Sequence, residues 1–330
     1  MNVLELFSGI GGMHMALEAS CVEGNVVASI DINQWANKVY EHNFPDTKLL
    51  NRNIEGLSVD FVNSLDVNVI LMSPPCQPFT RNGLQNDIND PRTNPFLQIL
   101  DILPKLTKVD RILVENVKGF EKSQMRDILV NKLKENNFIY QEFILSPTQV
   151  GVPNTRHRYY CLARKNPQKF SFPSGDLMET LPNCDPEDLF PISNILEENL
   201  DLSSFNIPIK QLLKRWRILD ISYIDSNRSC CFTKAYGRYL EGTGSIFAPK
   251  TKQECSCIFE QIEQTQNEET KLKLLKSIGL RFFTPKEISR LMSFPEKFSF
   301  PNEITNKQRY MLLGNSINVK VVGELIKLLK

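Results

Sequence analysis

A cysteine stands where the sequence would hold a reactive thiol in place. The apolar run Val67–Met72 predicts a strand, and after Ser73 it is followed by Pro74, Pro75 and Cys76. The prolines fix φ at two positions and restrict the residue before them, so the thiol is held rigidly at the mouth of the predicted sheet. We interpret Cys76 as a nucleophile. The alternative is a buried, inert cysteine.

A carboxyl group ends a second apolar run. Glu115 directly follows Arg111–Val114, another predicted strand. A carboxyl there could act as a general acid or a hydrogen-bond donor if removal from water keeps it protonated. The alternative is a capping or surface carboxylate. The cysteine at another strand end favours the functional interpretation.

Two arginines form a third candidate pair. Arg156 and Arg158 are two residues apart in the strand-like run R-H-R-Y-Y-C-L-A, so they share one face and His157 points the other way. Two adjacent guanidinium groups suit a phosphate or a base carbonyl. The alternative is a solvated edge strand.

A glycine turn suggests a bound cofactor. The segment Phe7–Gly12 (F-S-G-I-G-G) follows an apolar run and opens a helical pattern, and Asp31 ends the next apolar run. A carboxylate at that place can hold ribose hydroxyls, which suits an adenosine-containing cofactor. His14 stands where a dinucleotide fingerprint has its third glycine, so the motif fits NAD poorly and a cofactor without phosphate better.

The elements that must position these residues alternate between strand and helix. Such alternation predicts an α/β fold with a doubly wound, mostly parallel, Rossmann-like sheet, in which ligands bind at the carboxyl ends of the strands. The predicted strands include Val3–Phe7, Val26–Ile30, Val67–Met72 and Arg111–Val114. Predicted helices begin near Asn33 and at Thr284; one polar helix covers 251–276, and a last one runs from about Ser316 to Lys330.

The chain has 330 residues, of which 41% are hydrophobic, so disorder over its whole length is excluded. The sequence changes near residue 166, where prolines punctuate an irregular stretch, which predicts a smaller domain over 166–280 inserted between residues 1–165 and 281–330 of a larger one. Residues 77–95 are polar and rich in Gly, Asn, Asp and Pro, which predicts a lid-like loop.

The net charge of +1 excludes an overall basic coat for nucleic acid, so a nucleic-acid surface must be local. Between residues 205 and 240, seven Lys and Arg stand against two Asp, with aromatic residues among them. We predict that four of these residues contact nucleic-acid phosphates: Lys214, Arg215, Arg217 and Lys234. The alternative is a solvated helix face, since L-L-K-R-W-R-I-L has helical spacing.

No apolar run reaches membrane-spanning length, and no secretory signal is visible. The eight cysteines and three histidines lack the spacing of a zinc site, so we expect no metal. Reduced cysteines then suggest a cytoplasmic protein that could also enter the nucleus.

Taken in order, these motifs resemble the cytosine-5 methyltransferases. The series is F-x-G-x-G (7–11), P-P-C-Q (74–77), E-N-V (115–117), R-x-R (156–158) and G-N-S (314–316). The segment C-F-T-K-A-Y (231–236), together with P-F-T-R-N-G (78–83) and E-N-V-K-G-F-E (115–121), is similar to the small eukaryotic branch called DNA methyltransferase homologue two. That resemblance implies methylation of cytosine 38 in the anticodon loop of aspartate tRNA, with DNA left open as a weak second partner.

The resemblance implies S-adenosylmethionine as the cofactor. It places Phe7, Ile10, Gly11 and Gly12 along the cofactor, Asp31 on the ribose, Ile54 and Glu55 by the adenine, Ser73 at the fourth strand end, and Asn315 and Ser316 at the closing turn. DNA-methylating relatives have an acidic residue before the isoleucine, where this chain has Asn53, so backbone groups would have to replace that side-chain contact.

The resemblance also implies catalytic roles. Cys76 would add to carbon 6 of cytosine, Glu115 would hold N3 with a proton, and Arg158, with Arg156 nearby, would hold the base carbonyl or a flanking phosphate. Three other functions stay open: a DNA cytosine-5 methyltransferase, a non-catalytic RNA-binding regulator, and an NAD oxidoreductase. The presence of Cys76 and Glu115 speaks against the regulator, and His14 speaks against NAD.

Overall fold

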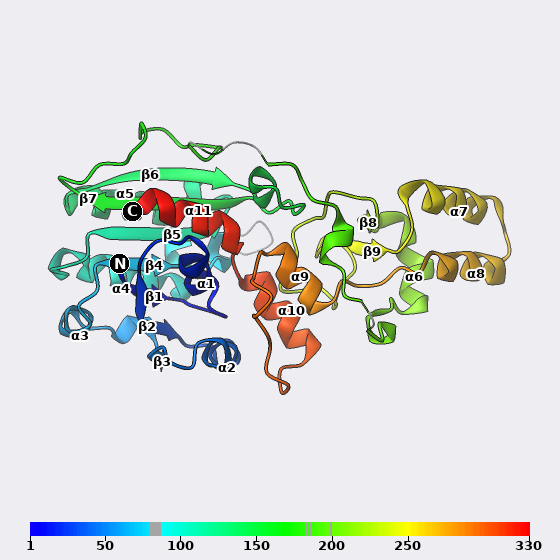
Figure 1. Ribbon diagram of the computed structural model, residues 1–330, viewed down its shortest axis with the longest axis horizontal. Helices are drawn as coiled ribbons and strands as arrows, with labels where there is room; N and C mark the ends of the chain where they lie inside the picture. The colour runs from blue at the N-terminus through cyan, green and yellow to red at the C-terminus, as the bar shows by residue number, and fades with distance from the viewer. Residues whose placement is uncertain (80–86, 183, 185–186, 199) are drawn as a thin grey trace.

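The computed structural model describes residues 1–79, 87–182, 184, 187–198 and 200–330. Seven strands form one sheet in the order β3-β2-β1-β4-β5-β7-β6 (Figure 1). β7 runs antiparallel to β5 and β6, and the other pairs are parallel. The strands are β1 (Asn2–Leu6), β2 (Asn25–Asp31), β3 (Leu49–Asn51), β4 (Val69–Met72), β5 (Arg111–Val117), β6 (Phe138–Leu145) and β7 (Arg158–Lys165). The predicted mostly parallel α/β fold is confirmed.

Helices cover both faces of this sheet, because alternate strand residues point to opposite sides and both sides are apolar. In β1, Val3 belongs to one buried cluster and Leu4 and Leu6 to the other. The first cluster includes α1 (Gly12–Ala19), α2 (Gln34–Asn43) and α11 (Val319–Leu329). The second includes α3 (Val59–Ser64), α4 (Asn94–Ile102) and α5 (Gln124–Glu135).

The winding of the sheet reverses between β1 and β4, which are neighbours. From β1 the chain continues outward to β2 and β3, and from β4 it continues the other way to β5. Connections therefore leave these two strands in opposite directions, and a crevice opens at their carboxyl ends. Phe7 and Ser73 directly follow the two strands at this crevice.

The second part of the chain carries a two-stranded parallel sheet and three helices, far from the large sheet in Figure 1. Its elements are α6 (Ile209–Arg215), β8 (Ile221–Tyr223), β9 (Ile246–Ala248), α7 (Lys252–Gln264) and α8 (Glu268–Ile278). Ile221, Ile246 and Ile262 belong to the same buried cluster as Val3, so apolar packing continues between the two parts. Within the described ranges, every helix is too short or too polar to cross a membrane.

The single polar helix predicted over 251–276 is wrong. The Asn267 side chain accepts a hydrogen bond from the Thr270 amide at 2.9 Å and begins a second helix, so α7 and α8 are separate. Asn residues favour such caps over helix interiors. The predicted helix start at Thr284 is confirmed: Thr284 and Glu287 form a capping box at the head of α9 (Pro285–Leu291).

The last helix begins later than predicted. Ser316 caps the end of α10 (Asn306–Asn315), and α11 begins at Val319, where the Asn318 side chain accepts from the Val321 amide at 3.1 Å. In the predicted loop 77–95, residues 77–79, 87–89 and 91–93 form short 3-10 turns, and α4 begins at Asn94. Residues 80–86 of that loop lie outside the described residues, as does the T-R-N-G portion of its motif.

Candidate active site

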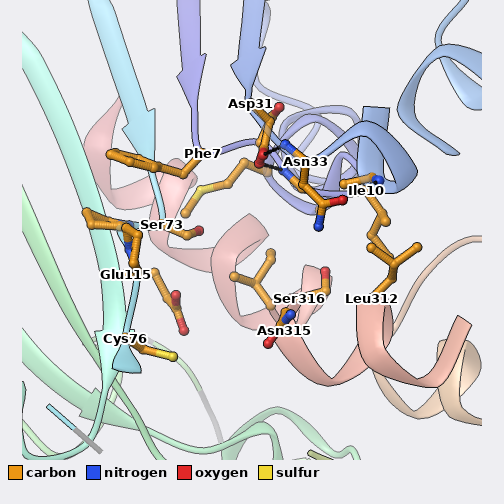
Figure 2. A pocket seen from close by; sticks show the side chains of 18 of the residues that line it. Phe7, Ile10, Asp31, Asn33, Ser73, Cys76, Glu115, Leu312, Asn315 and Ser316 are labelled. Carbon is orange, nitrogen blue, oxygen red and sulfur yellow. Dashed lines mark hydrogen bonds between the residues drawn. The ribbon is translucent and has the colours of Figure 1, made fainter. Parts of the chain in front are cut away.

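A cavity of about 340 Å³ lies at the crevice (Figure 2). It is walled by the carboxyl ends of β1, β2, β4 and β5, by the segment before β7, and by the turn between α10 and α11. Many residues singled out in the sequence meet here. They are Phe7, Ile10, Gly12, Asp31, Ser73, Cys76, Glu115, Arg156, Arg158, Asn315 and Ser316.

The glycine turn is shaped by close neighbours on one side and by open space on the other. A Cβ on Gly11 (φ 83°) would lie 2.4 Å from the Phe44 ring, and a Cβ on Gly12 would lie 2.6 Å from Ile317. Both positions therefore require glycine. At Gly9 (φ 54°), which lines the cavity, no neighbouring atom lies within 4 Å of the Cβ position, so the backbone is open to a ligand.

Asp31 fixes this turn from the end of β2. Its carboxylate accepts the Gly9 amide at 2.8 Å and the Asn33 amide at 2.8 Å, which are the dashed lines in Figure 2. Burial raises the pKa of Asp31, and the amides of Asn33 and Gly9 oppose that rise. Because each carboxylate oxygen has two lone pairs, Asp31 can still accept from a ligand hydroxyl.

His14, which stands where a dinucleotide-binding motif has its third glycine, belongs to a buried polar cluster. Its ring stacks on Phe44 at a 3.7 Å centroid distance, and its Nδ1 lies 2.9 Å from the Tyr40 hydroxyl. The Tyr40 hydroxyl donates to Glu5, which also accepts the His14 amide. Burial raises the pKa of Glu5 to about 8 and lowers that of His14 to about 4, so both side chains are uncharged near neutral pH.

Cys76 is held on a short, pinned segment. The Asn116 side chain donates to the Pro74 carbonyl at 3.3 Å, which ties the end of β5 to the residues after β4. On the other side, the Phe79 amide donates to the Cys76 carbonyl at 3.0 Å. The backbone that carries the thiol is therefore held in place, and Cys76 lies at the cavity edge (Figure 2).

The thiol, a carboxyl and a guanidinium lie together at this edge. Arg158 Nε lies 3.5 Å from Glu115 Oε1, and the side chains are 16% and 10% exposed. Burial raises the pKa of Glu115, opposed by Arg158. Burial also raises the pKa of the Cys76 thiol, and the nearby Glu115 adds to the rise while Arg158 opposes it. The site thus holds a carboxyl biased toward its protonated form and a thiol whose ionisation depends on its neighbours.

Arg156 makes different contacts from those predicted. Its Nη1 donates to the Phe232 carbonyl at 3.1 Å, and its Nη2 donates to the carbonyls of Gly314, at 3.2 Å, and Ser316. The side chain is buried. These hydrogen bonds engage both Nη groups, while Arg156 also lines the cavity, so its contact with a base or phosphate stays a prediction. Arg156 precedes β7, so the strand alternation that paired it with Arg158 does not apply.

The sequence did not single out several residues at this site, Cys231 and Ile32 among them. Cys231 Sγ accepts from Arg156 Nη1 at 3.3 Å and from Arg158 Nη2 at 3.7 Å. Burial alone would raise the pKa of Cys231, but the two arginines hold it below its usual value. Ile32 lines the cavity with 66% of its surface exposed. Its place directly after Asp31, which was predicted to bind the cofactor, is the feature of the sequence that could have indicated this role for Ile32.

Three predicted cofactor residues do not line the cavity. Gly11 faces Phe44, Ile54 is buried in the apolar cluster beneath the sheet, and Glu55 is exposed. Within the described ranges, no group of three His, Cys, Asp or Glu side chains is arranged to hold a metal ion.

The predicted basic residues divide into two groups. Arg215 pairs with Glu241 and Arg217 with Glu263, the latter at 3.6 Å, so acidic residues distant in sequence partly neutralise them. Lys214 lines a separate cavity of about 380 Å³ beside α6 and α8. Lys234 is exposed, and its charge lowers the pKa of Cys76, which places it on the side of the catalytic cavity.

Comparison with known proteins gives consistent results over the whole chain. The family model described as C-5 cytosine-specific DNA methylase matches residues 1–330. The chain is 51% identical to the Spodoptera frugiperda "tRNA (cytosine(38)-C(5))-methyltransferase" over 99% of this chain and 98% of that one. It is 43% identical to the Homo sapiens protein of the same name, over 100% and 99%.

Two further matches concern the type of nucleic acid and the fold. A Dictyostelium discoideum protein named "DNA (cytosine-5)-methyltransferase" is 38% identical over 100% of this chain and 94% of that one. The crystal structure of a Spodoptera frugiperda DNMT2 mutant superposes with a TM-score of 0.91 at 50% identity, covering 99% of both chains. The similarity in fold therefore extends over the same full length as the similarity in sequence.

Proposed function

Since this chain belongs to the C-5 cytosine-specific methylase family, we propose that it methylates carbon 5 of cytosine 38 in the anticodon loop of a tRNA, with aspartate tRNA the foremost candidate. The observation that carries this proposal is the meeting of the Cys76 thiol, the Glu115 carboxyl and the Arg158 guanidinium at one edge of the cavity. Its full-length relatives named as tRNA cytosine-38 methyltransferases support the choice of RNA.

The other end of the cavity fits S-adenosylmethionine. Ser8 Oγ is buried there without a hydrogen-bond partner, and the Gly9 backbone is open. Among the described cavity-lining residues, only Arg156 and Arg158 are basic, so no lining side chain at the glycine turn offers a positive charge to a phosphate. When bound, S-adenosylmethionine supplies an electrophilic methyl group. We propose that Phe7, Ile10, Gly12, Asp31, Ser73, Asn315 and Ser316 hold it.

The chain's own residues then activate the base. Carbon 5 of cytosine is a weak nucleophile, and addition of the Cys76 thiolate at carbon 6 makes it enamine-like. Glu115 keeps a proton on N3 and so stabilises the charge that develops on addition. Arg158, fixed against Glu115, holds the base carbonyl. Once carbon 5 carries the methyl group that the bound cofactor would supply, its proton passes to a base, the bond between carbon 6 and the Cys76 sulfur breaks, and the ring is restored.

The base must leave its stack to reach this edge. A thiol fixed by two prolines at a strand end cannot follow a base into a helix, so the nucleotide has to be turned out. Anticodon-loop bases are already partly unstacked, which lowers the cost by a few kcal/mol. This favours an RNA loop over a DNA duplex.

Bisulfite sequencing tests the proposal. Purified protein is incubated with S-adenosylmethionine and either total tRNA or duplex DNA. Conversion-resistant cytosine at position 38 of tRNA is expected, with DNA methylated weakly or not at all. Methylation confined to DNA would contradict the proposal and indicate a DNA cytosine-5 methyltransferase. The description of the family and the name of the Dictyostelium relative both mention DNA.

Asp31→Ala should weaken cofactor binding by about 1–3 kcal/mol, since ribose hydroxyls lose their acceptor and the Gly9 amide its partner. Calorimetry with S-adenosylhomocysteine measures this. Asp46→Ala is the matched control, because that carboxylate is exposed after α2. Unchanged affinity in the Asp31 variant would remove Asp31 from the cofactor site.

We propose that Lys214, Arg215, Arg217 and Lys234 contact RNA phosphates. Because Arg215 and Arg217 are already paired, the lysines should carry most of the effect. Replacing Lys214 and Lys234 with alanine should reduce the slope of log K against log salt by roughly 1–2, at slightly less than one unit per phosphate contact. The matched Arg215→Ala, Arg217→Ala variant should reduce it less.

Filter binding of tRNA at several salt concentrations gives these slopes. Equal slopes for the wild type and the lysine variant would leave this surface with no role in RNA binding.

We further propose that residues 166–280 form the target-recognition domain inserted between 1–165 and 281–330, and that the enzyme works in the cytoplasm and can enter the nucleus.

A further inference from the structure

A closed loop beside the cavity carries an aromatic side chain that takes no part in the core. The loop covers residues 233–243, and the Thr233 amide donates to the Thr243 carbonyl at 2.8 Å, which joins its two ends. Within it, the consecutive residues 237–239 are all exposed, and the last of them is Tyr239. We call residues 233–243 the tyrosine loop.

The tyrosine loop starts at the cavity wall and runs along α10 toward the amino end of that helix. A Cβ on Gly314, which lines the cavity, would lie 2.2 Å from the Lys234 amide nitrogen. A Cβ on Gly237 would lie 2.8 Å from the Tyr310 ring. Tyr310 and Gly314 are four residues apart in α10, so they lie about one helical turn, roughly 5–6 Å, from each other. The exposed residues of the loop are therefore close to the cavity.

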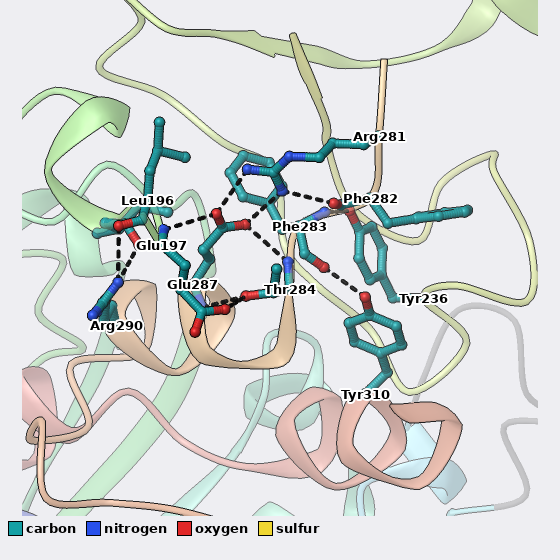
Figure 3. A network of polar contacts seen from close by, with 11 residues as sticks. Leu196, Glu197, Tyr236, Arg281, Phe282, Phe283, Thr284, Glu287, Arg290 and Tyr310 are labelled. Atoms are coloured by element: carbon teal, nitrogen blue, oxygen red, sulfur yellow. Dashed lines mark hydrogen bonds and ion pairs between the residues drawn. The ribbon is translucent and has the colours of Figure 1, made fainter. Parts of the chain in front are cut away.

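Hydrogen bonds and ring packing hold this loop against α10 (Figure 3). The Tyr310 hydroxyl donates to the Phe283 carbonyl at 2.6 Å, and the Phe283 amide donates to the Tyr236 hydroxyl at 2.9 Å. The Tyr236 and Tyr310 rings pack edge to face, 5.1 Å apart. The Thr243 hydroxyl donates to the Tyr239 carbonyl at 2.7 Å. The backbone that carries the Tyr239 side chain is therefore fixed before any ligand binds.

Tyr239 differs from the tyrosine three residues before it. Tyr236 is 3% exposed and packs against three other aromatic rings, whereas Tyr239 is 52% exposed. Within the part of the chain that the structure describes, the Tyr239 hydroxyl has no hydrogen bond and no second ring packs on it. The partner of its ring is the Arg238 guanidinium, 5.1 Å from the ring centroid. Since single exposed tyrosines are common, the surroundings of Tyr239 must indicate what it does.

Those surroundings are positively charged. Among the described residues, neither Lys234 nor Arg238 has an acidic partner, and the loop's own carboxylate, Glu241, is paired with Arg215. Proteins that bind single-stranded nucleic acid combine such cations, which meet the phosphates, with an aromatic ring on which a base stacks. Unpaired RNA bases in loops are the usual ligands of such rings. The exposed part of the tyrosine loop has both components.

We propose that Tyr239 is a stacking platform for an unpaired RNA base near the nucleotide that enters the cavity, with Lys234 and Arg238 on the adjacent phosphates; the proposal rests on the proposed function. Every base has a face that can stack, so this platform selects an unpaired loop and not a sequence. In a duplex each base is already stacked between its neighbours, so the platform has no base to bind.

A double-mutant cycle between the side chain and the RNA tests the proposal. The probe is aspartate tRNA assembled from synthetic halves, in which each anticodon-loop base except cytosine 38 is replaced in turn by an abasic site. Tyr239→Ala should bind the intact tRNA about 5–10-fold more weakly than the wild type, at the lower end of what one stacked base contributes. At one loop position, base removal should weaken wild-type binding by a similar factor.

In Tyr239→Ala, removal of that same base should cost less than about 2-fold, because its partner is already missing. Tyr239→Phe keeps the ring and should behave like the wild type at every position. If base removal cost the same in the wild type and in Tyr239→Ala at all positions, no base would stack on Tyr239 and the platform would be wrong.

Two further measurements separate stacking from a general structural role. Tyr239→Ala should raise KM for tRNA about 5–10-fold and change kcat less than about 2-fold, because stacking holds the RNA equally before and during the reaction. Binding of a blunt RNA duplex should be unchanged in Tyr239→Ala and weaker in Lys234→Ala. A Tyr239 variant that lowers kcat, or that loses duplex binding as well, would show a distorted loop and overturn the proposal.

Tyr140→Ala is the matched control. Tyr140 also has a cation over its ring, Lys134 at 5.7 Å. It pairs through Ala163 with Ile112, near the amino end of β5, so it lies at the end of the sheet opposite the cavity. Its variant should match the wild type throughout, and an equal loss of tRNA affinity in both tyrosine variants would contradict the platform. A wild type that neither binds nor methylates aspartate tRNA overturns the proposed function instead.

Discussion

Cys76→Ala should abolish methyl transfer, by roughly 10⁴-fold or more, because the variant lacks the thiolate that adds to carbon 6 of the base. Affinity for S-adenosylhomocysteine should stay within a few-fold, since the thiol acts on the base and lies beside Glu115 and not at the glycine turn. Single-turnover assays with labelled methyl donor measure the first quantity, and calorimetry measures the second.

Cys21→Ala is the control for this change, because that cysteine is exposed at the end of α1. RNA with 5-fluorocytosine at position 38 adds a direct readout: fluorine cannot leave as a proton does, so a covalent complex should persist on a denaturing gel with the wild type and be missing with Cys76→Ala. Substantial turnover by the alanine variant would end the assignment of Cys76 as nucleophile.

The pH dependence of the wild type follows from the same thiol. Burial and the neighbouring Glu115 raise the pKa of Cys76, so the thiol is protonated below that pKa and reactive above it. The single-turnover rate should therefore rise with pH through the neutral and mildly alkaline range. A rate that falls as the pH rises from neutral would place the controlling ionisation elsewhere.

Glu115→Gln should lower the single-turnover rate by about 10²–10⁴-fold, the usual contribution of a placed general acid. Glutamine keeps the shape but cannot hold a proton on N3 through a carboxyl group. The change also removes a charge that raises the pKa of Cys76, so iodoacetamide should alkylate that thiol faster at a given pH. Mass spectrometry of the Cys76 peptide follows the alkylation.

Glu135→Gln serves as the matched control at an exposed position near the end of α5. It should change neither the rate nor the alkylation of Cys76. If Glu115→Gln slowed methylation while slowing alkylation as well, its effect would lie in the shape of the pocket, and the acid role of Glu115 would be wrong.

The parts of this site that could be predicted are those that local sequence controls. The glycine turn, Cys76 and Glu115 each follow an apolar run, and the carboxyl ends of parallel strands meet at one edge. Asn267 shows that prediction from local sequence can also fail. This residue caps the start of α8 and so divides the single helix that was predicted over 251–276. Its side-chain hydrogen bond outweighed a uniform helical pattern.

Arg156 could not have been predicted in the same way. Its partners, at 232, 314 and 316, lie more than 70 residues along the chain, and only the tertiary fold brings their carbonyls to it. The charges of Arg215 and Arg217 are likewise met by Glu241 and Glu263 from other elements. Local charge counts overstate a basic surface when acidic partners arrive from elsewhere.

The packing of α11 on α1 has a consequence for the order in which the protein folds. Gly323 lies against the Ala16 carbonyl, and Ile317 fills the space that Gly12 leaves free. The wall opposite the glycine turn therefore comes from a segment at the far end of the described fold. Until residues 317–330 dock, the sheet can begin to form, but the glycine turn has no opposite wall. Because contacts between distant segments are slow to form, we expect the cofactor seat to be among the last parts of the fold to be completed.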